Sequence, residues 1–199
     1  ELRGLTLRMY DILQSLTAFG MDAPTDEFMS ESEYRACWEI DNVEHYLRNT
    51  VTPLSSLAGK ATSPLLARII SDADASLGRR LIDITMKKAD MNLQDAPEGY
   101  DANFYFGHAE TLMPLLSLMR IPGCYDDSKD LATLSDRWQD YNVVPLGANL
   151  DIILLSDKRQ RTYVALRHNG HFVAPMSGRM IVPWTEYKGY LTDIMVNLR

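Results

Sequence analysis

A histidine and a glutamate two residues apart, His108 and Glu110, are the residues of this sequence that point most directly to chemistry. They follow an apolar run over residues 102–106 and the single residue Gly107, and they precede an apolar stretch that ends at Met119. An imidazole can bind an anionic oxygen, and a nearby carboxylic acid can give a proton to a departing alcohol. The pair therefore predicts a site that binds an anionic ester and transfers protons.

The elements around this pair are expected to place it at a corner between a strand and a helix. Residues 102–106 predict a buried strand, Gly107 predicts a tight turn, and Thr111 is the expected N-cap of a helix that runs through Met119. Backbone N–H groups and the positive end of the helix dipole meet at the start of such a helix. The corner is therefore where we expect the chemistry.

Metal binding is the rival chemistry for His108 and Glu110. A metal site needs at least a third ligand in a matching geometry, and the sequence places no such partner close to the pair. We therefore expect neither a metal nor a cofactor at this site.

The remaining histidines are expected to be structural. His168 and His171 flank the dipeptide Asn169-Gly170, a strong signal for a hairpin, because a type I′ turn needs positive φ at both central residues. Both histidines should then be exposed at the tip of that hairpin. His45 lies on a predicted helix and is expected to be a surface or packing residue, since the sequence places no acid–base partner beside it.

The segment 103–119, NFYFGHAETLMPLLSLM, resembles the second catalytic motif of the histidine acid phosphatase superfamily. The likeness is strongest to the multiple inositol polyphosphate phosphatase branch, the His-Ala-Glu phytases. Three more segments resemble that family in the same order. They are residues 36–47 (a helix of its α-domain), 63–77 (the helix before the motif strand) and 144–150 (the return strand beside the active site).

This resemblance implies hydrolysis of phosphomonoesters, with inositol polyphosphates such as phytate as substrates, through a phosphohistidine intermediate. His108 would be both a catalytic and a substrate-binding residue, because it would donate hydrogen bonds to the phosphoryl oxygens. Glu110 would be the general acid that protonates the leaving oxygen, and then the base towards water. The resemblance also implies a secreted, periplasmic or organelle-lumen protein. The alternative is a non-catalytic binding or scaffold domain with a degenerate phosphate site.

The sequence departs from the family at the nucleophile. The family's attacking histidine lies in an R-H-G-x-R-x-P motif, which these 199 residues do not contain. The run from Arg167 to His171 holds Arg-His and a glycine, but its Asn-Gly turn signal argues against a catalytic role. The chain therefore resembles the C-terminal half of a phosphatase, and the nucleophile is expected in a missing N-terminal half of the same protein. This chain alone is expected to be inactive.

The expected fold class is α/β. The chain should form part of a histidine-phosphatase-like α/β domain, with a central mixed sheet flanked by helices, and part of an inserted α-helical domain. Residues 1–62 are assigned to the helical domain and residues 63–199 to the α/β domain that carries the motif. The expected elements are helices over 5–19, 31–47, 63–88, 112–119 and 184–198, and antiparallel strands over 149–156, 161–168 and 171–175.

Composition is typical of a folded globular protein, with 46% hydrophobic and 24% charged residues. A net charge of −7 argues against a nucleic-acid partner, and no apolar run reaches the roughly 20 residues that span a bilayer. Two cysteines are too few for a disulfide framework. Cys37 is expected to be a buried helix residue, and Cys124 is expected in a loop, where it could pair with a missing segment. Four acidic residues are expected to form a solvated face: Asp72, Asp74, Asp83 and Asp90.

Overall fold

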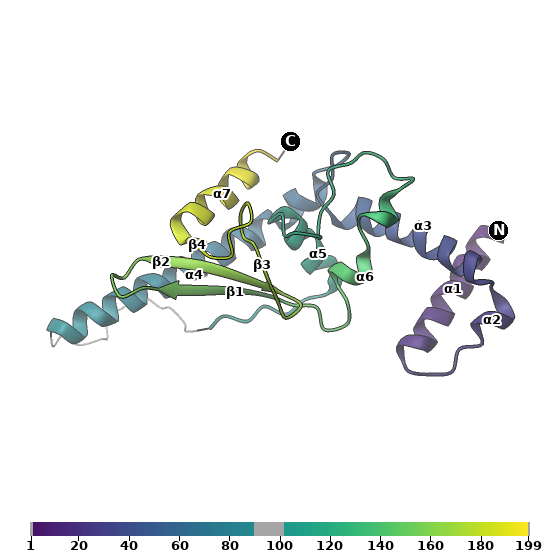
Figure 1. The fold of residues 1–199 in the computed structure, drawn as a ribbon, viewed down its shortest axis with the longest axis horizontal. Coiled ribbons are helices and arrows are strands. Elements are labelled where there is room, and N and C mark those ends of the chain that lie inside the picture. Colours follow the sequence, from purple (N-terminus) through teal and green to yellow (C-terminus); the bar gives the residue numbers. More distant parts are fainter. Residues whose placement is uncertain (1, 90–101, 199) are drawn as a thin grey trace.

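A computed structural model describes residues 2–89 and 102–198 of the protein (Figure 1). The helices are α1 Leu2–Ala18, α2 Thr25–Phe28, α3 Glu31–Asn49, α4 Leu57–Ala89, α5 Ala109–Leu118, the 3-10 helix η2 Leu134–Asp136, α6 Asp140–Val143 and α7 Trp184–Val196. The strands are β1 Leu150–Ser156, β2 Thr162–His168, β3 His171–Val173 and β4 Val182–Pro183. The molecule is elongated, with α1 and α2 at one end and the end of α4 at the other. Within the described ranges, no helix is both long enough and apolar enough to cross a bilayer.

The first helices begin and end where local sequence signals predict. Gly20 adopts a φ of +68° just after α1, which a glycine tolerates without strain. Ser30 and Glu33 form a capping box at the start of α3: the Ser30 hydroxyl accepts a hydrogen bond from the Glu33 amide, and the Glu33 carboxylate accepts one from the Ser30 amide. Cys37 is buried on this helix, as expected.

The prediction that Ser63 and Pro64 open a helix is wrong. Helix α4 begins at Leu57, and Pro64 lies inside it. The Ser63 hydroxyl donates to the carbonyl oxygen of Gly59 at 2.8 Å, so it bonds back to the preceding turn and does not cap a helix. The same helix continues past Gly78 to Ala89, as expected for this region. The domain boundary predicted after residue 62 falls inside α4, and the division into two domains stays a prediction.

The strands form a small antiparallel sheet around β2. Strand β2 pairs with β1 along its whole length, and with β3 and β4 on its other edge. Asn169 and Gly170 connect β2 to β3 with φ angles of +48° and +82°, so the predicted type I′ turn is confirmed. All pairs in this sheet are antiparallel, so the described residues show an α/β protein without the parallel pairs of the expected mixed sheet.

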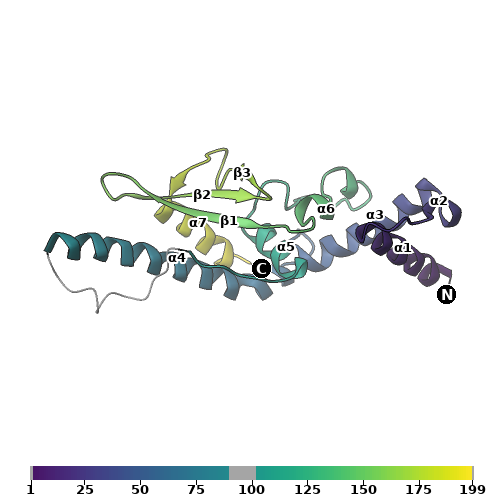
Figure 2. The ribbon, with the colours of Figure 1, turned by 90° about the horizontal axis from the view of Figure 1, so that it is seen from below.

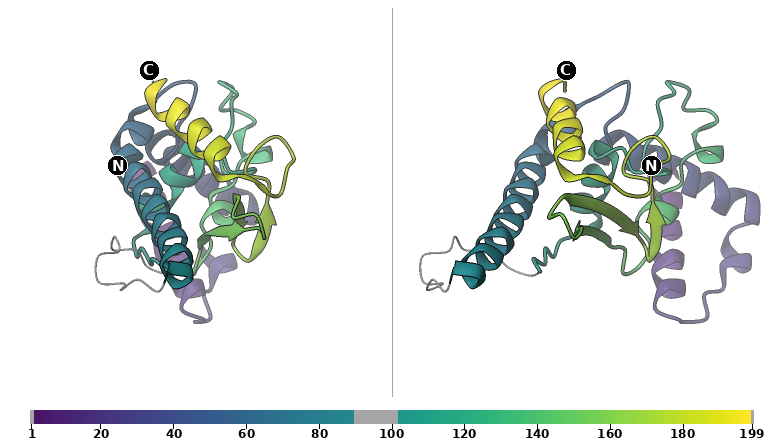
Figure 3. Two further views of the ribbon diagram at one scale, coloured as in Figure 1. Left: turned by 90° about the vertical axis from the view of Figure 1, so that its left-hand side faces the viewer. Right: turned by 60° about the vertical axis from the view of Figure 1, so that its left-hand side comes forward.

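Helix α7 lies between the sheet and α4 (Figures 2 and 3). Asp74 of α4 fixes this packing, because its carboxylate accepts hydrogen bonds from Trp184 Nε1, at 2.8 Å, and from the Lys188 ammonium group. The expectation of a solvated face did not include this contact, although the Asp74 side chain is still 39% exposed. The Asp83 side chain and all of Asp90, the other half of that expected face, lie outside the described residues.

Residues of α3, α4, α5, α7 and β2 form the main core, and its fully buried side chains include Leu66, Leu116, Leu166 and Leu191. A second, smaller cluster joins α1 to α3. Helix α5 contributes more buried residues than its length suggests: Met113 through Leu118 are all buried. The helix that begins one residue after His108 is therefore anchored firmly in the core.

Two buried tyrosines of this core predict opposite mutational effects. The Tyr46 hydroxyl donates to the carbonyl oxygen of Asp126 at 2.8 Å, whereas the buried Tyr187 hydroxyl has no hydrogen-bond partner among the described residues. Removing one partner of a made bond costs about 1 kcal/mol, and removing an unsatisfied buried hydroxyl relieves its desolvation penalty. Tyr46→Phe should lower, and Tyr187→Phe should hold or raise, the free energy of unfolding in urea. A loss of equal size in both variants would contradict this difference.

Candidate active site

The segment before the His-Ala-Glu motif is not a buried strand. Residues 102–107 pair with no other strand among the described residues, and their side chains are exposed. Phe104 is 79% exposed and Phe106 is 94% exposed. A strand requires a neighbouring strand to satisfy its N–H and C=O groups, and the sheet built from β1 to β4 does not extend to this segment. The expectation from apolar character alone is therefore corrected.

Polar contacts hold this extended segment against α4 (Figure 2). The Tyr105 hydroxyl donates to the Asp72 carboxylate, which also accepts a hydrogen bond from Arg68 Nε at 2.9 Å. These bonds hold the pKa of Asp72 below its usual range, with the Arg68 contact as the larger cause. The Asp72 side chain is 21% exposed, and its contact with Tyr105 positions the chain just before His108.

His108, and not Thr111, is the N-cap of α5. Its backbone is extended, and its carbonyl oxygen accepts hydrogen bonds from the amides of Thr111, at 3.0 Å, and Leu112, at 3.2 Å. The His108 side chain takes no part in the cap, so the imidazole is left available. Glu110 lies in the first turn of the same helix. The predicted placement of both residues at the start of a helix is confirmed, one turn earlier than Thr111 suggested.

Both candidate side chains are exposed at the end of a buried helix. His108 and Glu110 are exposed, whereas the helix is buried from Met113 onwards. The first amides of a helix have no acceptor within it, and the helix dipole adds positive potential at that end. Pro114 has no N–H, so it also removes the usual helical donor to the carbonyl of Glu110. The arrangement can bind an anion and present an imidazole and a carboxyl group to it.

His45 has partners that the sequence did not reveal. Its Nδ1 lies 2.7 Å from Asp140 Oδ2, and its Nε2 lies 4.0 Å from Asp41 Oδ1. The hydrogen bond to Asp140 raises the pKa of His45, with help from nearby carboxylates and against the effect of burial. The contact between Asp41 and His45 could have been predicted from their i, i+4 spacing on a helix. Asp140 is 95 residues away in the sequence, and no local signal connects it to His45.

His168 is buried, which contradicts the prediction that it is exposed at the tip of a hairpin. It is 8% exposed, and its Nε2 lies 2.9 Å from the carbonyl oxygen of Val143. Burial lowers the pKa of His168, which favours the neutral form of a ring that acts here as a hydrogen-bonding core residue. Its Nδ1 faces the thiol of Cys124 at 3.7 Å, and burial raises the pKa of that thiol to about 12. Cys124 lies in a loop as expected, but its buried thiol is not accessible to a missing segment. His171 is exposed, as predicted.

The expectation of a return strand over residues 144–150 is wrong, because residues 144–149 form a turn and a loop and only Leu150 belongs to a strand. The chain turns at Pro145 to Gly147, where Gly147 has a φ of +74°, and β1 begins only at Leu150. The turn leaves Leu146 on the surface, 92% exposed. The helices expected over 36–47 and 63–77 are present, within α3 and α4.

Comparison with known proteins places the chain in a family. A search of curated proteins finds no match to this sequence. The family model of the histidine phosphatase superfamily (branch 2) matches residues 14–169. The matched range covers most of the chain and includes α3, the motif at His108 to Glu110, and the strands β1 and β2. The chain therefore belongs to branch 2 of the histidine phosphatase superfamily.

Proposed function

We propose that residues 1–199 are part of a phosphatase that hydrolyses phosphomonoesters of inositol polyphosphates. Family membership suggests phosphatase activity, and the His-Ala-Glu motif supports the narrower substrate class by its resemblance to phytases. One structural observation carries the assignment: His108 and Glu110 are both exposed at the N-terminal end of α5, a helix otherwise anchored in the core.

His108 binds and stabilises the phosphoryl group in this proposal. Its imidazole is not used by the helix cap, so it can donate a hydrogen bond to a phosphoryl oxygen. Charge spreads over the three equatorial oxygens of phosphorus as the ester bond breaks, and fixed donors aimed at those oxygens lower the barrier. The amides at the start of α5 add to the same positive potential.

Glu110 is the proton donor. A histidine supplied by polypeptide outside these 199 residues would attack phosphorus, and the bond from phosphorus to the inositol oxygen would break. Protonated Glu110 gives its proton to that oxygen, so the alcohol leaves neutral. Glu110, now a carboxylate, takes a proton from the water that hydrolyses the phosphohistidine, which releases phosphate and restores both residues.

Substitution of Glu110 by glutamine tests this role directly. In the full-length protein, Glu110→Gln should lower the turnover of phytate by on the order of 10²-fold or more, because glutamine has no proton to give to the leaving oxygen. The first step with p-nitrophenyl phosphate, which releases nitrophenolate, should slow much less, because nitrophenolate leaves without being protonated. Pre-steady-state release of the alcohol from both esters isolates this first step from the later hydrolysis of phosphohistidine, which loses its base with either ester.

Glu31→Gln is the matched control. Glu31 is also an exposed glutamate in the first turn of a helix, α3, and it should leave both rates unchanged. Normal turnover of phytate by Glu110→Gln would refute the assignment of the proton donor. Failure of the full-length wild-type protein to release phosphate from either ester would refute the proposed function itself.

A further inference from the structure

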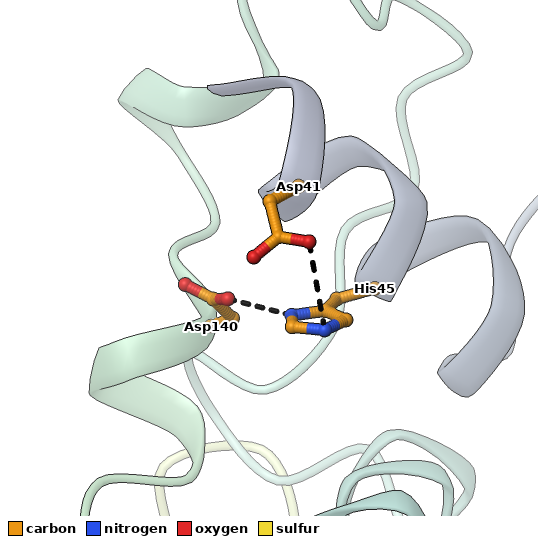
Figure 4. A group of neighbouring side chains, drawn as sticks. All are labelled: Asp41, His45 and Asp140. Carbon is orange, nitrogen blue, oxygen red and sulfur yellow. Dashed lines mark hydrogen bonds and ion pairs between the residues drawn. The ribbon is translucent and has the colours of Figure 1, made fainter. Parts of the chain in front are cut away.

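Three side chains that the proposed phosphatase chemistry does not use meet between α3 and α6 (Figure 4). Asp41 and His45 extend from successive turns of α3, and Asp140 is the first residue of α6. One nitrogen of His45 and one oxygen of each carboxylate lie within 4.8 Å of one another. We propose that Asp41, His45 and Asp140 bind a divalent transition-metal ion of the zinc type.

The ligand set suits zinc and related ions better than calcium or magnesium. Imidazole nitrogen favours first-row transition metals, whereas calcium and magnesium sites are built from oxygen ligands. With metal–ligand bonds of about 2.0–2.2 Å, ligand atoms on one ion lie roughly 3–4.4 Å apart, so a cluster within 4.8 Å needs only small side-chain shifts. One nitrogen and two carboxylate oxygens would leave further coordination positions to water.

Hydrogen bonds from neighbouring residues hold Asp140 in place independently of any ion. Its Oδ1 accepts hydrogen bonds from Trp38 Nε1, at 3.1 Å, and from the amide of Tyr141, at 2.8 Å, while its Oδ2 faces His45. The fully buried Asn42 accepts a hydrogen bond from the Asp140 amide at 2.9 Å. Supporting contacts of this kind orient the ligands of metal sites and raise their affinity.

Charge and access also favour a cation here. Two carboxylates and a neutral imidazole carry a charge of −2, which a divalent ion balances, and Glu44 on α3 and Asp11 on α1 add negative potential at Asp41. The side chains of His45 and Asp41 are 40% and 31% exposed, whereas that of Asp140 is 14% exposed. An ion can therefore enter from solvent and connect α3 to α6.

Metal titration of the full-length protein, purified without a polyhistidine tag, tests the site. Calorimetry should show one equivalent of Zn²⁺ bound with a dissociation constant in the micromolar range or tighter, and an excess of Mg²⁺ or Ca²⁺ should not compete. His45→Gln should weaken Zn²⁺ binding by at least about tenfold, and so should Trp38→Phe, which removes the supporting bond to Asp140 and keeps an aromatic ring at this position. His171→Ala, which changes an exposed histidine elsewhere, should bind as the wild type does.

Co²⁺ absorption and circular dichroism distinguish a missing metal site from a variant that fails to fold. Co²⁺ bound to the wild-type protein should give visible d–d absorption that Zn²⁺ abolishes, a result that does not depend on any variant folding. Circular dichroism then shows which variants are folded. Zinc affinity that is unchanged in folded His45→Gln, or a wild-type protein that binds neither Zn²⁺ nor Co²⁺ at millimolar concentration, would overturn the site without bearing on the phosphatase proposal.

Discussion

Replacing His108 with alanine should lower phosphate release by roughly 10²–10³-fold, the loss expected when one donor to the transition-state oxygens is removed. The imidazole lies at the N-cap of α5 without a role in the cap, so its loss should leave the helix intact. Stabilisation of the phosphoryl oxygens is needed whatever alcohol departs. His108→Ala should therefore slow the first step with phytate and with p-nitrophenyl phosphate to a similar extent, whereas Glu110→Gln should slow that step chiefly with phytate.

His171→Ala controls for the loss of an exposed imidazole, since His171 is an exposed residue of the β2–β3 hairpin and should retain both activities. Unchanged hydrolysis of both esters by His108→Ala would show that the motif histidine does not bind the phosphoryl group. A loss of activity confined to phytate would instead indicate that His108 interacts with the leaving group and not with the phosphoryl group.

The elements predicted correctly are those that a few neighbouring residues determine. Ser30 and Glu33 form a capping box whose partners are three residues apart, and the Asn169-Gly170 turn needs only positive φ at two adjacent positions. The prediction that His108 and Glu110 lie at the start of a helix also depended only on neighbouring residues, because the apolar stripe of that helix follows them directly in the sequence. The local sequence is sufficient to predict these features because the interacting residues are within a few positions of one another.

The incorrect or incomplete predictions concern residues whose surroundings come from distant parts of the chain. His168 is buried because Val143 and Cys124 pack against its ring, and neither is near it in sequence. Asp74 is held by residues of α7 more than a hundred positions away. Residues 102–107 have an apolar pattern typical of a strand, but a strand also requires a partner, which that pattern cannot supply.

Truncation of Leu116 to alanine should lower the free energy of unfolding by about 2–5 kcal/mol, the range for a fully buried leucine whose removal leaves a cavity. Leu116 is 0% exposed and belongs to the main core, in the middle of the buried run of α5. Urea unfolding followed by circular dichroism measures the loss. Because α5 carries His108 and Glu110 at its other end, this burial is what keeps the two side chains in position.

Leu146→Ala removes the same atoms from a leucine that is 92% exposed, so it should change the free energy of unfolding by no more than about 0.5 kcal/mol. Equal effects of the two substitutions would show that α5 is not packed in the core. A large loss for Leu116→Ala with unchanged phytate turnover at low temperature, where the protein stays folded, would separate the two contributions of the helix. The buried half would then supply stability, and the exposed first turn would supply the chemistry.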